Sequence, residues 1–292
     1  MSLSRINLYE PHTLDQALKA LADSEENRIL AGGTDLLVDY KEGLTEAKHL
    51  ISLQKIQELK GIEEKNGKIR IGAMVTPKEI ASHALVQRHL PALVEAACSM
   101  ASNQIRSMAT IGGNIASAVP SADLPPVLIA AEAEIRLVCL QDRRIVPLLE
   151  FFTGPRMTVC RDEEILTDIL FPVPEPNTGL SYKKVKLREA NALAVASVAA
   201  RITLMDDRID EASVVLGAVG PAPILVLEAS GILKGKKPSS GLFKKASAIA
   251  KEKSRPITDV RGSIWYRKEL IKTLAQRALK EASVRAGEDR KG

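Results

Sequence analysis

The hydrophobic and polar positions of the chain follow two different periods, which predict an α+β protein. Runs in which apolar and polar residues alternate predict strands, and apolar residues spaced three and four apart predict helices. Strands are predicted over 6–9, 28–30, 49–52, 62–64, 69–71, 134–140, 143–146, 163–171, 181–186, 194–205 and 209–218. Helices are predicted over 14–22, 77–83, 91–100, 124–131, 148–152, 225–233, 240–250 and from about 266 to 282.

Turn residues separate several of these strands. Asn66-Gly67 is a strong signal for a tight hairpin, and Asp206-Asp207 joins two β-rich runs into a meander. The proline-rich stretch 172–177 is expected to be a linker. The predicted organisation is therefore two lobes, a C-terminal α+β domain and a disordered tail, over 1–55, 56–176, 177–285 and 286–292.

Two stretches rich in small residues carry the candidate chemistry. Ala31 to Asp35 follows a predicted strand, and its two glycines would leave backbone N–H groups facing an anion such as pyrophosphate. The segment 102–122 lacks periodicity and is expected to be a long functional loop centred on Thr110 to Asn114. A Gly-Gly pair after a strand is also common in plain turns, but two such stretches suggest two loops that grip one ligand.

Polar residues next to the second stretch could add contacts. Ser117 and Ser121 supply hydroxyl groups, and Asp123 supplies an acceptor. Asp123 also stands at the N-cap position of the predicted helix 124–131, and this structural role alone is an equal alternative. The chain contains neither a P-loop nor a G-x-G-x-x-G fingerprint, so a Rossmann-type site is disfavoured.

The sequence contains no constellation typical of a catalytic or metal-binding site. Its four histidines lie in no motif, and no Ser–His–Asp, Cys–His or metal-ligand spacing appears. We therefore predict no catalytic residue and no metal ligand. This pattern favours a protein in which a bound cofactor carries the chemistry.

Charge is distributed unevenly along the chain. Residues 1–176 hold 18 basic and 24 acidic residues, a net charge of −6, whereas residues 177–292 hold 23 and 12, a net charge of +11. No aromatic residues interleave the lysines and no nucleic-acid motif appears, so nucleic acid is not an expected partner. The basic part is either a docking face for a more acidic partner chain or a solvated surface.

Three cysteines and the absence of long apolar runs bear on location. Cys98, Cys139 and Cys160 fit neither a disulfide framework nor a metal cluster, which favours a reducing, cytoplasmic setting. Cys98 is expected to be a small buried side chain. No membrane span is expected, and the first ten residues lack the apolar core of a signal peptide. Trp265 and Tyr266 are expected to be packing residues.

The motif AGGTDLL at 31–37, followed by QIRSMATIGGNIASAVPSADLPP at 104–126, resembles the FAD-binding medium subunit of the molybdenum hydroxylases. That family includes xanthine dehydrogenase and aerobic carbon monoxide dehydrogenase, and the resemblance extends over nearly the whole chain. It implies bound FAD and two N-terminal α+β lobes of the vanillyl-alcohol-oxidase-like (PCMH) type. It also implies a C-terminal domain of antiparallel sheet and helices.

The resemblance also implies which residues contact FAD. Those of the first phosphate loop and its flanks are Arg28, Leu30, Ala31, Gly32, Gly33, Thr34, Asp35 and Leu36. Those of the second loop and its flanks are Thr110, Ile111, Gly112, Gly113, Asn114, Ser117, Asp123 and Leu124, with Asp123 on the cofactor's sugar. Those expected near the flavin ring are Leu166, Tyr182 and Lys183. From the residues alone, Leu166 is better explained as a core residue and Lys183 as a residue of an exposed edge strand.

The resemblance implies an electron-transfer function. The chain would take electrons from the 2Fe–2S clusters of a small subunit, in a complex with a large molybdopterin subunit, and pass them through FAD to NAD or a quinone. A heterotrimer or a dimer of heterotrimers is expected. No cysteine-rich insertion is present, so the chain itself should bind no cluster, and Ala122 stands where the family often has serine. A non-redox assembly subunit and a stand-alone FAD-dependent oxidoreductase are the alternatives.

Overall fold

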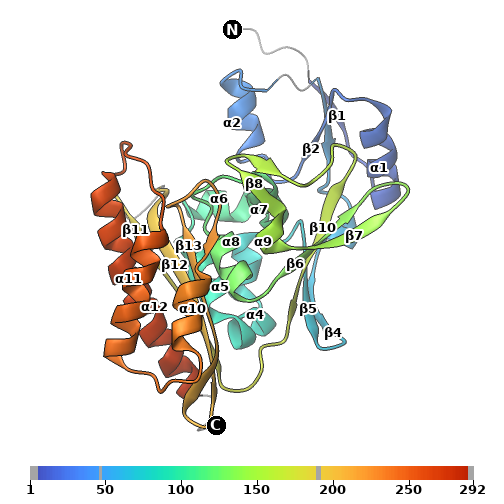
Figure 1. The fold of residues 1–292 in the computed structure, drawn as a ribbon. Helices are drawn as coiled ribbons and strands as arrows, with labels where there is room; N and C mark the ends of the chain where they lie inside the picture. The colour runs from blue at the N-terminus through green and yellow to red at the C-terminus, as the bar shows by residue number, and fades with distance from the viewer. Residues whose placement is uncertain (1–5, 46–47, 189–191, 289–292) are drawn as a thin grey trace.

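The computed structural model describes residues 6–45, 48–188 and 192–288, which form two N-terminal lobes and a C-terminal domain (Figure 1). Lobe 1 holds a parallel sheet of strand order β1-β3-β2, with bounds Asn7–Tyr9, His49–Ser52 and Asn27–Leu30. Helix α1 (Leu14–Asp23) is capped by Thr13, whose hydroxyl accepts from the backbone N–H of Gln16. Helix α2 (Leu36–Lys41) follows the first glycine pair.

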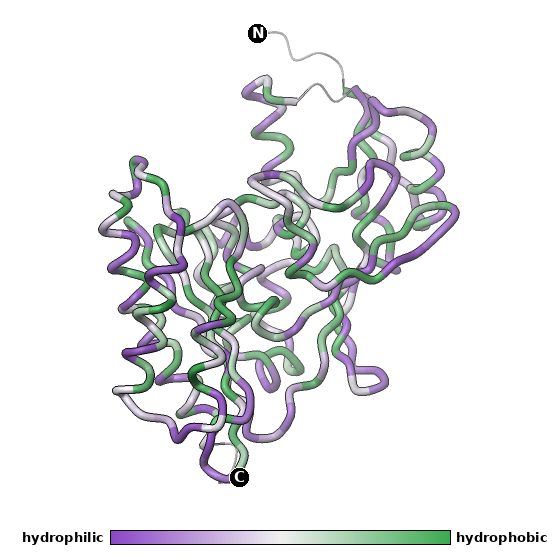
Figure 2. The backbone as a smooth tube through the Cα atoms, viewed as in Figure 1, coloured by the Kyte–Doolittle hydropathy of each residue, from purple (hydrophilic) through white to green (hydrophobic). Residues whose placement is uncertain are grey.

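Lobe 2 is built on an antiparallel sheet of order β4-β5-β10-β6-β7. The strands span Ile62–Lys65, Lys68–Gly72, Ile165–Pro172, Glu134–Val138 and Arg143–Pro147. Asn66 and Gly67 have φ values of 53° and 70°, so the predicted tight hairpin between β4 and β5 is confirmed. This hairpin is hydrophilic and projects from the molecule (Figure 2).

Short helices cover the sheet of lobe 2. They are η1 (Gln57–Leu59), α3 (Pro77–Ser82), α4 (Ala84–His89), α5 (Pro91–Ser99), α6 (Asn103–Met108), α7 (Ile111–Ala116), α8 (Leu124–Ala130) and α9 (Leu148–Phe151). A small hairpin, β8 (Phe152–Gly154) and β9 (Met157–Thr158), follows α9.

The expectation of one long loop over 102–122 is wrong, because two capped helices form there. The hydroxyl of Ser102 accepts from the N–H of Ile105 at the start of α6, and Thr110 does the same for Gly113 in α7. Each helix has only six residues, too few for a hydrophobic period to stand out. Local capping and packing outweigh the poor helix propensity of the Gly112-Gly113 pair.

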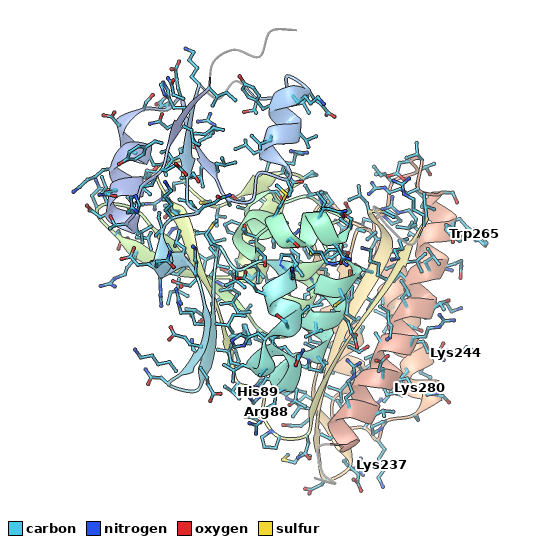
Figure 3. All side chains as sticks on the ribbon, turned by 180° about the vertical axis from the view of Figure 1, so that it is seen from behind. Arg88, His89, Lys237, Lys244, Trp265 and Lys280 are labelled. Carbon is cyan, nitrogen blue, oxygen red and sulfur yellow. The ribbon has the colours of Figure 1, made fainter. Side chains whose placement is uncertain are left out.

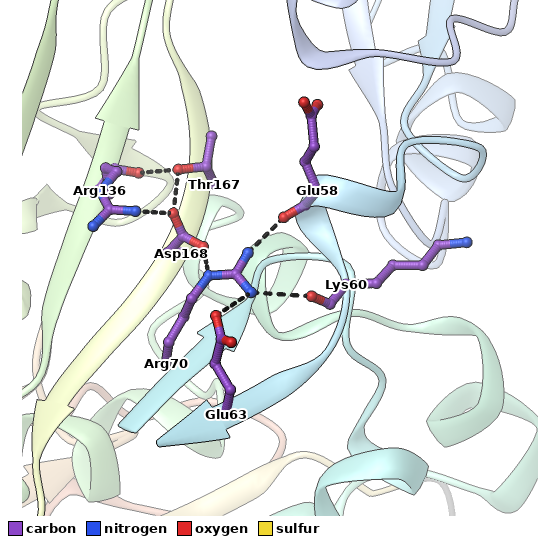
Figure 4. Close-up of polar contacts among 7 residues, drawn as sticks. All are labelled: Glu58, Lys60, Glu63, Arg70, Arg136, Thr167 and Asp168. Carbon is purple, nitrogen blue, oxygen red and sulfur yellow. Dashed lines mark hydrogen bonds and ion pairs between the residues drawn. The ribbon is translucent and has the colours of Figure 1, made fainter. Parts of the chain in front are cut away.

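A buried carboxylate ties the central strand of lobe 2 to its neighbours (Figure 4). Asp168 on β10 forms ion pairs with Arg70 of β5 and Arg136 of β6, and it accepts from the Thr167 hydroxyl at 2.8 Å. The Arg70 guanidinium also donates to the carbonyls of Glu58 and Lys60, in the segment that leads from lobe 1. The network therefore ties three strands of the sheet to the segment 58–60.

The C-terminal domain is an antiparallel sheet between two layers of helices. The order is β11-β12-β13-β14, with bounds Thr178–Lys186, Ala194–Met205, Arg208–Gly217 and Ile224–Leu225. One face packs on α5 and α8 of lobe 2, and the other packs on α10 (Leu227–Leu233), α11 (Ser240–Lys253) and α12 (Ile264–Glu288). Because both faces are covered, β12 is apolar along most of its length.

Several side chains lie elsewhere than expected. Trp265 is 70% exposed and Tyr266 40% exposed, so neither aromatic packs in a core, and Figure 3 shows Trp265 pointing outward. Cys98 is exposed rather than buried, because it lies on the outer side of α5. Helix α12 continues to Glu288 with Ala286 buried, so 286–288 are not a tail, and 289–292 lie outside the described residues. Among the described residues, no helix is both long and apolar enough to cross a membrane.

Candidate functional site

A cavity of about 570 Å³ lies where the two N-terminal lobes meet, and both glycine-rich stretches line it. The residues that line it fall within 29–39 and at 53 in lobe 1, within 73–74, 100–123 and 156–166 in lobe 2, and at 192–193 in the C-terminal domain. Thirteen of the predicted contact residues line it: Ala31, Gly32, Gly33, Thr34, Asp35, Leu36, Thr110, Gly112, Gly113, Asn114, Ser117, Asp123 and Leu166. Their contact with a cofactor stays a prediction.

The first glycine pair leaves a row of backbone donors free. Among the described residues, the N–H groups of 32–35 have no hydrogen-bond partner within the protein. A Cβ on Gly32 would lie 2.1 Å from the carbonyl oxygen of Met108, so only glycine lets this loop approach α6. Gly33 has a φ of 71°, in the left-handed region that favours glycine. The loop therefore offers several N–H groups to an anion.

The second glycine pair is bonded differently. The N–H groups of Ile111 and Gly112 donate to the carbonyls of Val75 and Ala73 at 2.9 Å, and Gly113 donates to the Thr110 hydroxyl. A Cβ on Gly112 would lie 2.7 Å from that of Ala73. This stretch packs its backbone closely against Ala73 at the cavity wall, and its N–H groups at 111–113 already have partners.

The side chain of Asn114 turns an unpaired acceptor toward the cavity. Its side-chain Oδ1 is buried and lines the cavity, but it accepts no hydrogen bond from the residues that the structure describes. A buried polar atom of this kind is costly unless a partner arrives. Together with the free N–H groups of the first loop, it suits a ligand that carries both phosphate oxygens and hydroxyl or amide donors.

Asp123 lies at the N-cap position of α8, but its side chain makes no capping bond. Its Oδ1 accepts from the Tyr182 hydroxyl at 2.9 Å, and its Oδ2 accepts from Lys184 Nζ at 2.8 Å. Burial raises the pKa of Asp123 above its usual range, and the Lys184 ammonium and the Tyr182 hydroxyl act in the opposite direction. Burial also raises the pKa of Tyr182 well above its usual value.

Two further charged pairs stand at the cavity wall. Arg156, on the β8–β9 turn, pairs with Asp39 of α2. Glu164 pairs with Arg144 at 2.7 Å, and that hydrogen bond holds the pKa of Glu164 below its usual range. Burial, with Glu164 as a second cause, raises the pKa of the nearby Cys160 thiol to about 12.

Six of the predicted contact residues do not line the cavity. Arg28 is exposed and donates to the carbonyls of Glu25 and Asn27, and Leu30 lies under the glycine loop. Ile111 and Leu124 are fully buried in the core of lobe 2. Tyr182 lies behind Asp123, and Lys183 pairs with Glu281 of α12.

Other residues of the cavity carried no sequence signal. They include Ile29, Asp39, Leu53, Ala73, Met74, Met100, Ile105, Arg156, Cys160, Glu164 and Leu193. Alternation along β2 would have placed Ile29, rather than Arg28 or Leu30, on the cavity side. The pairing of Arg156 with Asp39, 117 positions earlier, leaves no trace in local sequence.

Comparison with known families identifies both halves of the chain. Residues 4–174 match the family described as the FAD binding domain in molybdopterin dehydrogenase. Residues 180–282 match the family described as the CO dehydrogenase flavoprotein C-terminal domain.

Relatives are similar over nearly their full lengths. The glyceraldehyde dehydrogenase medium chain of Sulfolobus acidocaldarius is 33% identical over 271 residues, covering 93% of this chain and 96% of the relative. The carbon monoxide dehydrogenase medium chain of Afipia carboxidovorans is 32% identical, covering 95% and 96%. A solved structure of carbon monoxide dehydrogenase from Hydrogenophaga pseudoflava superposes with a TM-score of 0.94 at 31% identity, covering 98% of this chain and 99% of that one.

Proposed function

This chain belongs to the family of FAD-binding subunits of the molybdenum hydroxylases, and we propose that it conducts electrons from the 2Fe–2S clusters of a partner chain to an external acceptor. It is a subunit of an FAD-dependent oxidoreductase. The proposed acceptor is a small molecule such as NAD or a quinone.

One observation supports the proposal most directly. In the part of the chain that the structure describes, the N–H groups of 32–35 have no partner, and the buried Oδ1 of Asn114 lines the same cavity. FAD carries a pyrophosphate that accepts hydrogen bonds and hydroxyl and amide groups that donate them, so the residues present fit it. When bound, FAD supplies the redox chemistry, because its ring accepts one electron or two.

The residues of the chain bind and orient the cofactor. The loop 32–35 would hold the pyrophosphate through its N–H groups, and Asn114 would accept from a donor of the cofactor. Asp123, held by two donors from β11, would accept from a sugar hydroxyl. The apolar side chains of Ile29 and Leu166 line the same cavity and would exclude water there.

The relatives support a multi-subunit assembly. They are medium chains or FAD-binding subunits of dehydrogenases, which implies small and large partner subunits. We propose that the small partner carries the 2Fe–2S clusters and the large one molybdopterin, in a heterotrimer or a dimer of heterotrimers. The basic C-terminal domain, with Lys244 and Lys280 facing outward, is a suitable docking face for a more acidic chain (Figure 3).

An absorption spectrum of the purified full chain tests the proposal. Titration with FAD should give flavin bands near roughly 370 and 450 nm that bleach when dithionite is added. The reduced chain should then be reoxidised by NAD or a quinone analogue, and expression with the partner subunits should yield a complex.

The outcomes separate the alternatives. Protein that neither contains nor takes up FAD contradicts the proposal. Bound FAD that dithionite reduces, but that the assembled complex cannot reduce with its substrate, indicates an assembly role instead. Turnover of a small substrate by the isolated chain indicates a stand-alone oxidoreductase.

A further inference from the structure

Asp123 receives both of its hydrogen bonds from one strand of the C-terminal domain. Tyr182 and Lys184 are two positions apart on β11, so their side chains leave the strand on the same side. The Tyr182 hydroxyl donates to one oxygen of the Asp123 carboxylate, and the Lys184 ammonium donates to the other. Both bonds cross from the C-terminal domain to the start of α8 in lobe 2.

All three side chains are withdrawn from water. Asp123 is 7% exposed, Tyr182 is 4% exposed, and the side chain of Lys184 is 4% exposed. Lys184 also donates to the carbonyl of Ser99 at the end of α5, which fixes its ammonium in place. An unpaired carboxylate at this depth would be strongly unfavourable, so Lys184 compensates the charge of Asp123.

Other charged groups lie near Asp123 and Lys184 without contacting the Asp123 carboxylate. Lys186, further along β11, acts on Asp123 from a distance. Glu95 of α5 accepts from the backbone N–H of Tyr182 at 3.4 Å and pairs with Arg285 of α12. None of these groups contacts the Asp123 carboxylate, so its two direct partners among the described residues are Tyr182 and Lys184.

Lys183, between the two, faces the opposite side of the strand. It pairs with Glu281 of α12, on the far layer of the domain. The strand register therefore selects Lys184, not its neighbour, as the lysine that reaches the cavity wall.

We propose that Tyr182 and Lys184 are positioning residues for Asp123, through which the C-terminal domain completes an FAD site that it contacts at few other points. This inference rests on the proposed function. An ionised and correctly oriented carboxylate is a stronger acceptor for a sugar hydroxyl than a protonated one, and both its charge and its orientation are set from β11. Lys184 also cancels a negative charge that would otherwise repel the anionic pyrophosphate.

A double-mutant cycle on the full chain tests the proposal. FAD dissociation constants are measured by flavin fluorescence for the wild type, Lys184→Met, Asp123→Asn and the double variant. Lys184→Met should weaken FAD binding about tenfold, the size expected for one hydrogen bond to a charged group. In the Asp123→Asn background the same change should alter affinity by less than about twofold, because Lys184 acts through Asp123.

Further variants distinguish the positioning of Asp123 from a general effect on folding. Lys184→Arg should restore most of the affinity, and Tyr182→Phe, which removes only a hydroxyl, should weaken FAD binding a few-fold without changing circular dichroism. Lys251→Met is the matched control, since its ion pair with Glu269 joins α11 to α12 and neither residue lines the cavity.

Two results would overturn the inference while leaving the proposed function intact. One is wild-type affinity in Lys184→Met and Tyr182→Phe. The other is an equal loss from Lys184→Met with and without Asp123, which would mean that the lysine acts on FAD independently. If the wild-type chain takes up no FAD, the proposed function itself fails.

Discussion

Arg156 and Asp39 form a two-point ion pair that joins the two N-terminal lobes at the wall of the cavity. Arg156 Nη1 lies 2.5 Å from Asp39 Oδ2, and Nη2 lies 3.2 Å from Oδ1. Asp39 is on α2 of lobe 1, whereas Arg156 is on the β8–β9 turn, which is held to lobe 2 by a bond from its N–H to the carbonyl of Ala118. The pair therefore links two walls of one site.

Replacement of Arg156 by methionine should loosen this link. It leaves Asp39 unpaired beside an anionic cofactor, so FAD should dissociate several-fold faster. The Arg156 side chain is 56% exposed, so the free energy of unfolding should fall by less than about 1 kcal/mol. Stopped-flow fluorescence after dilution and thermal melts measure the two effects. Lys19→Met, which breaks an exposed pair with Asp15 on α1, is the control, and equal dissociation rates in both variants would contradict the expectation.

Features carried by local pattern can be predicted from the sequence. The Asn66-Gly67 hairpin and the Asp206-Asp207 turn both have the positive φ values that their residues favour, and the long apolar strands and α12 stand out by periodicity. The two glycine stretches line one cavity, as expected for a shared site.

Features that depend on strand register or on distant contacts cannot be predicted from the sequence. Which side of β11 faces the cavity depends on how the C-terminal sheet packs on α8, so local sequence does not decide between Lys183 and Lys184. The helices α6 and α7 are not predicted because six residues without strong apolar periodicity resemble a loop. Trp265 is expected in a core from its residue type, but its position at the first turn of α12 exposes it.

A single methyl group added at Gly32 should displace the first glycine loop. An alanine Cβ would stand 2.1 Å from the Met108 carbonyl oxygen, and backbone on both sides cannot yield without moving the loop. Gly32→Ala should therefore weaken FAD binding by more than about tenfold and lower stability by about 1–3 kcal/mol. FAD titration and denaturant unfolding measure the two.

The control for Gly32 is another glycine with free space around it. A Cβ on Gly231 in α10 would meet no other atom within 4 Å, so Gly231→Ala should leave FAD binding unchanged and stabilise the helix by up to about 1 kcal/mol. If Gly32→Ala binds FAD as the wild type does, the close approach of the first loop to Met108 is not needed for the site.

Asp168 should matter for stability and not for cofactor binding. Asp168→Asn keeps the shape but removes the charge that two arginines share, so unfolding free energy should fall by about 2–3 kcal/mol. Glu63→Gln is the control, because that carboxylate is 56% exposed and 3.4 Å from Arg70, and it should cost less than about 1 kcal/mol. Urea unfolding measures both free energies. A loss in Asp168→Asn no larger than that in Glu63→Gln would show that the Asp168 network adds little to stability.

Cys160 should be alkylated more slowly than Cys98, and its alkylation rate should report on the cavity. Burial raises its pKa to about 12, so only about one thiol in ten thousand is ionised at pH 8. Alkylation by iodoacetamide, followed by peptide mass spectrometry, should therefore modify the exposed Cys98 first. The Cys160 rate should rise about tenfold per pH unit while the chain stays folded.

Replacing Glu164 tests what raises the pKa of the Cys160 thiol. Its negative charge is the second contribution to the raised pKa of Cys160, so Glu164→Gln should lower that pKa and speed alkylation at pH 8. Because Glu164 also pairs with Arg144, melting temperature must be recorded to exclude unfolding. FAD should slow alkylation of Cys160 but not of Cys98, since only Cys160 lines the cavity. Equal alkylation rates at Cys98 and Cys160 in folded protein at pH 7 would contradict both the burial of the Cys160 thiol and its raised pKa.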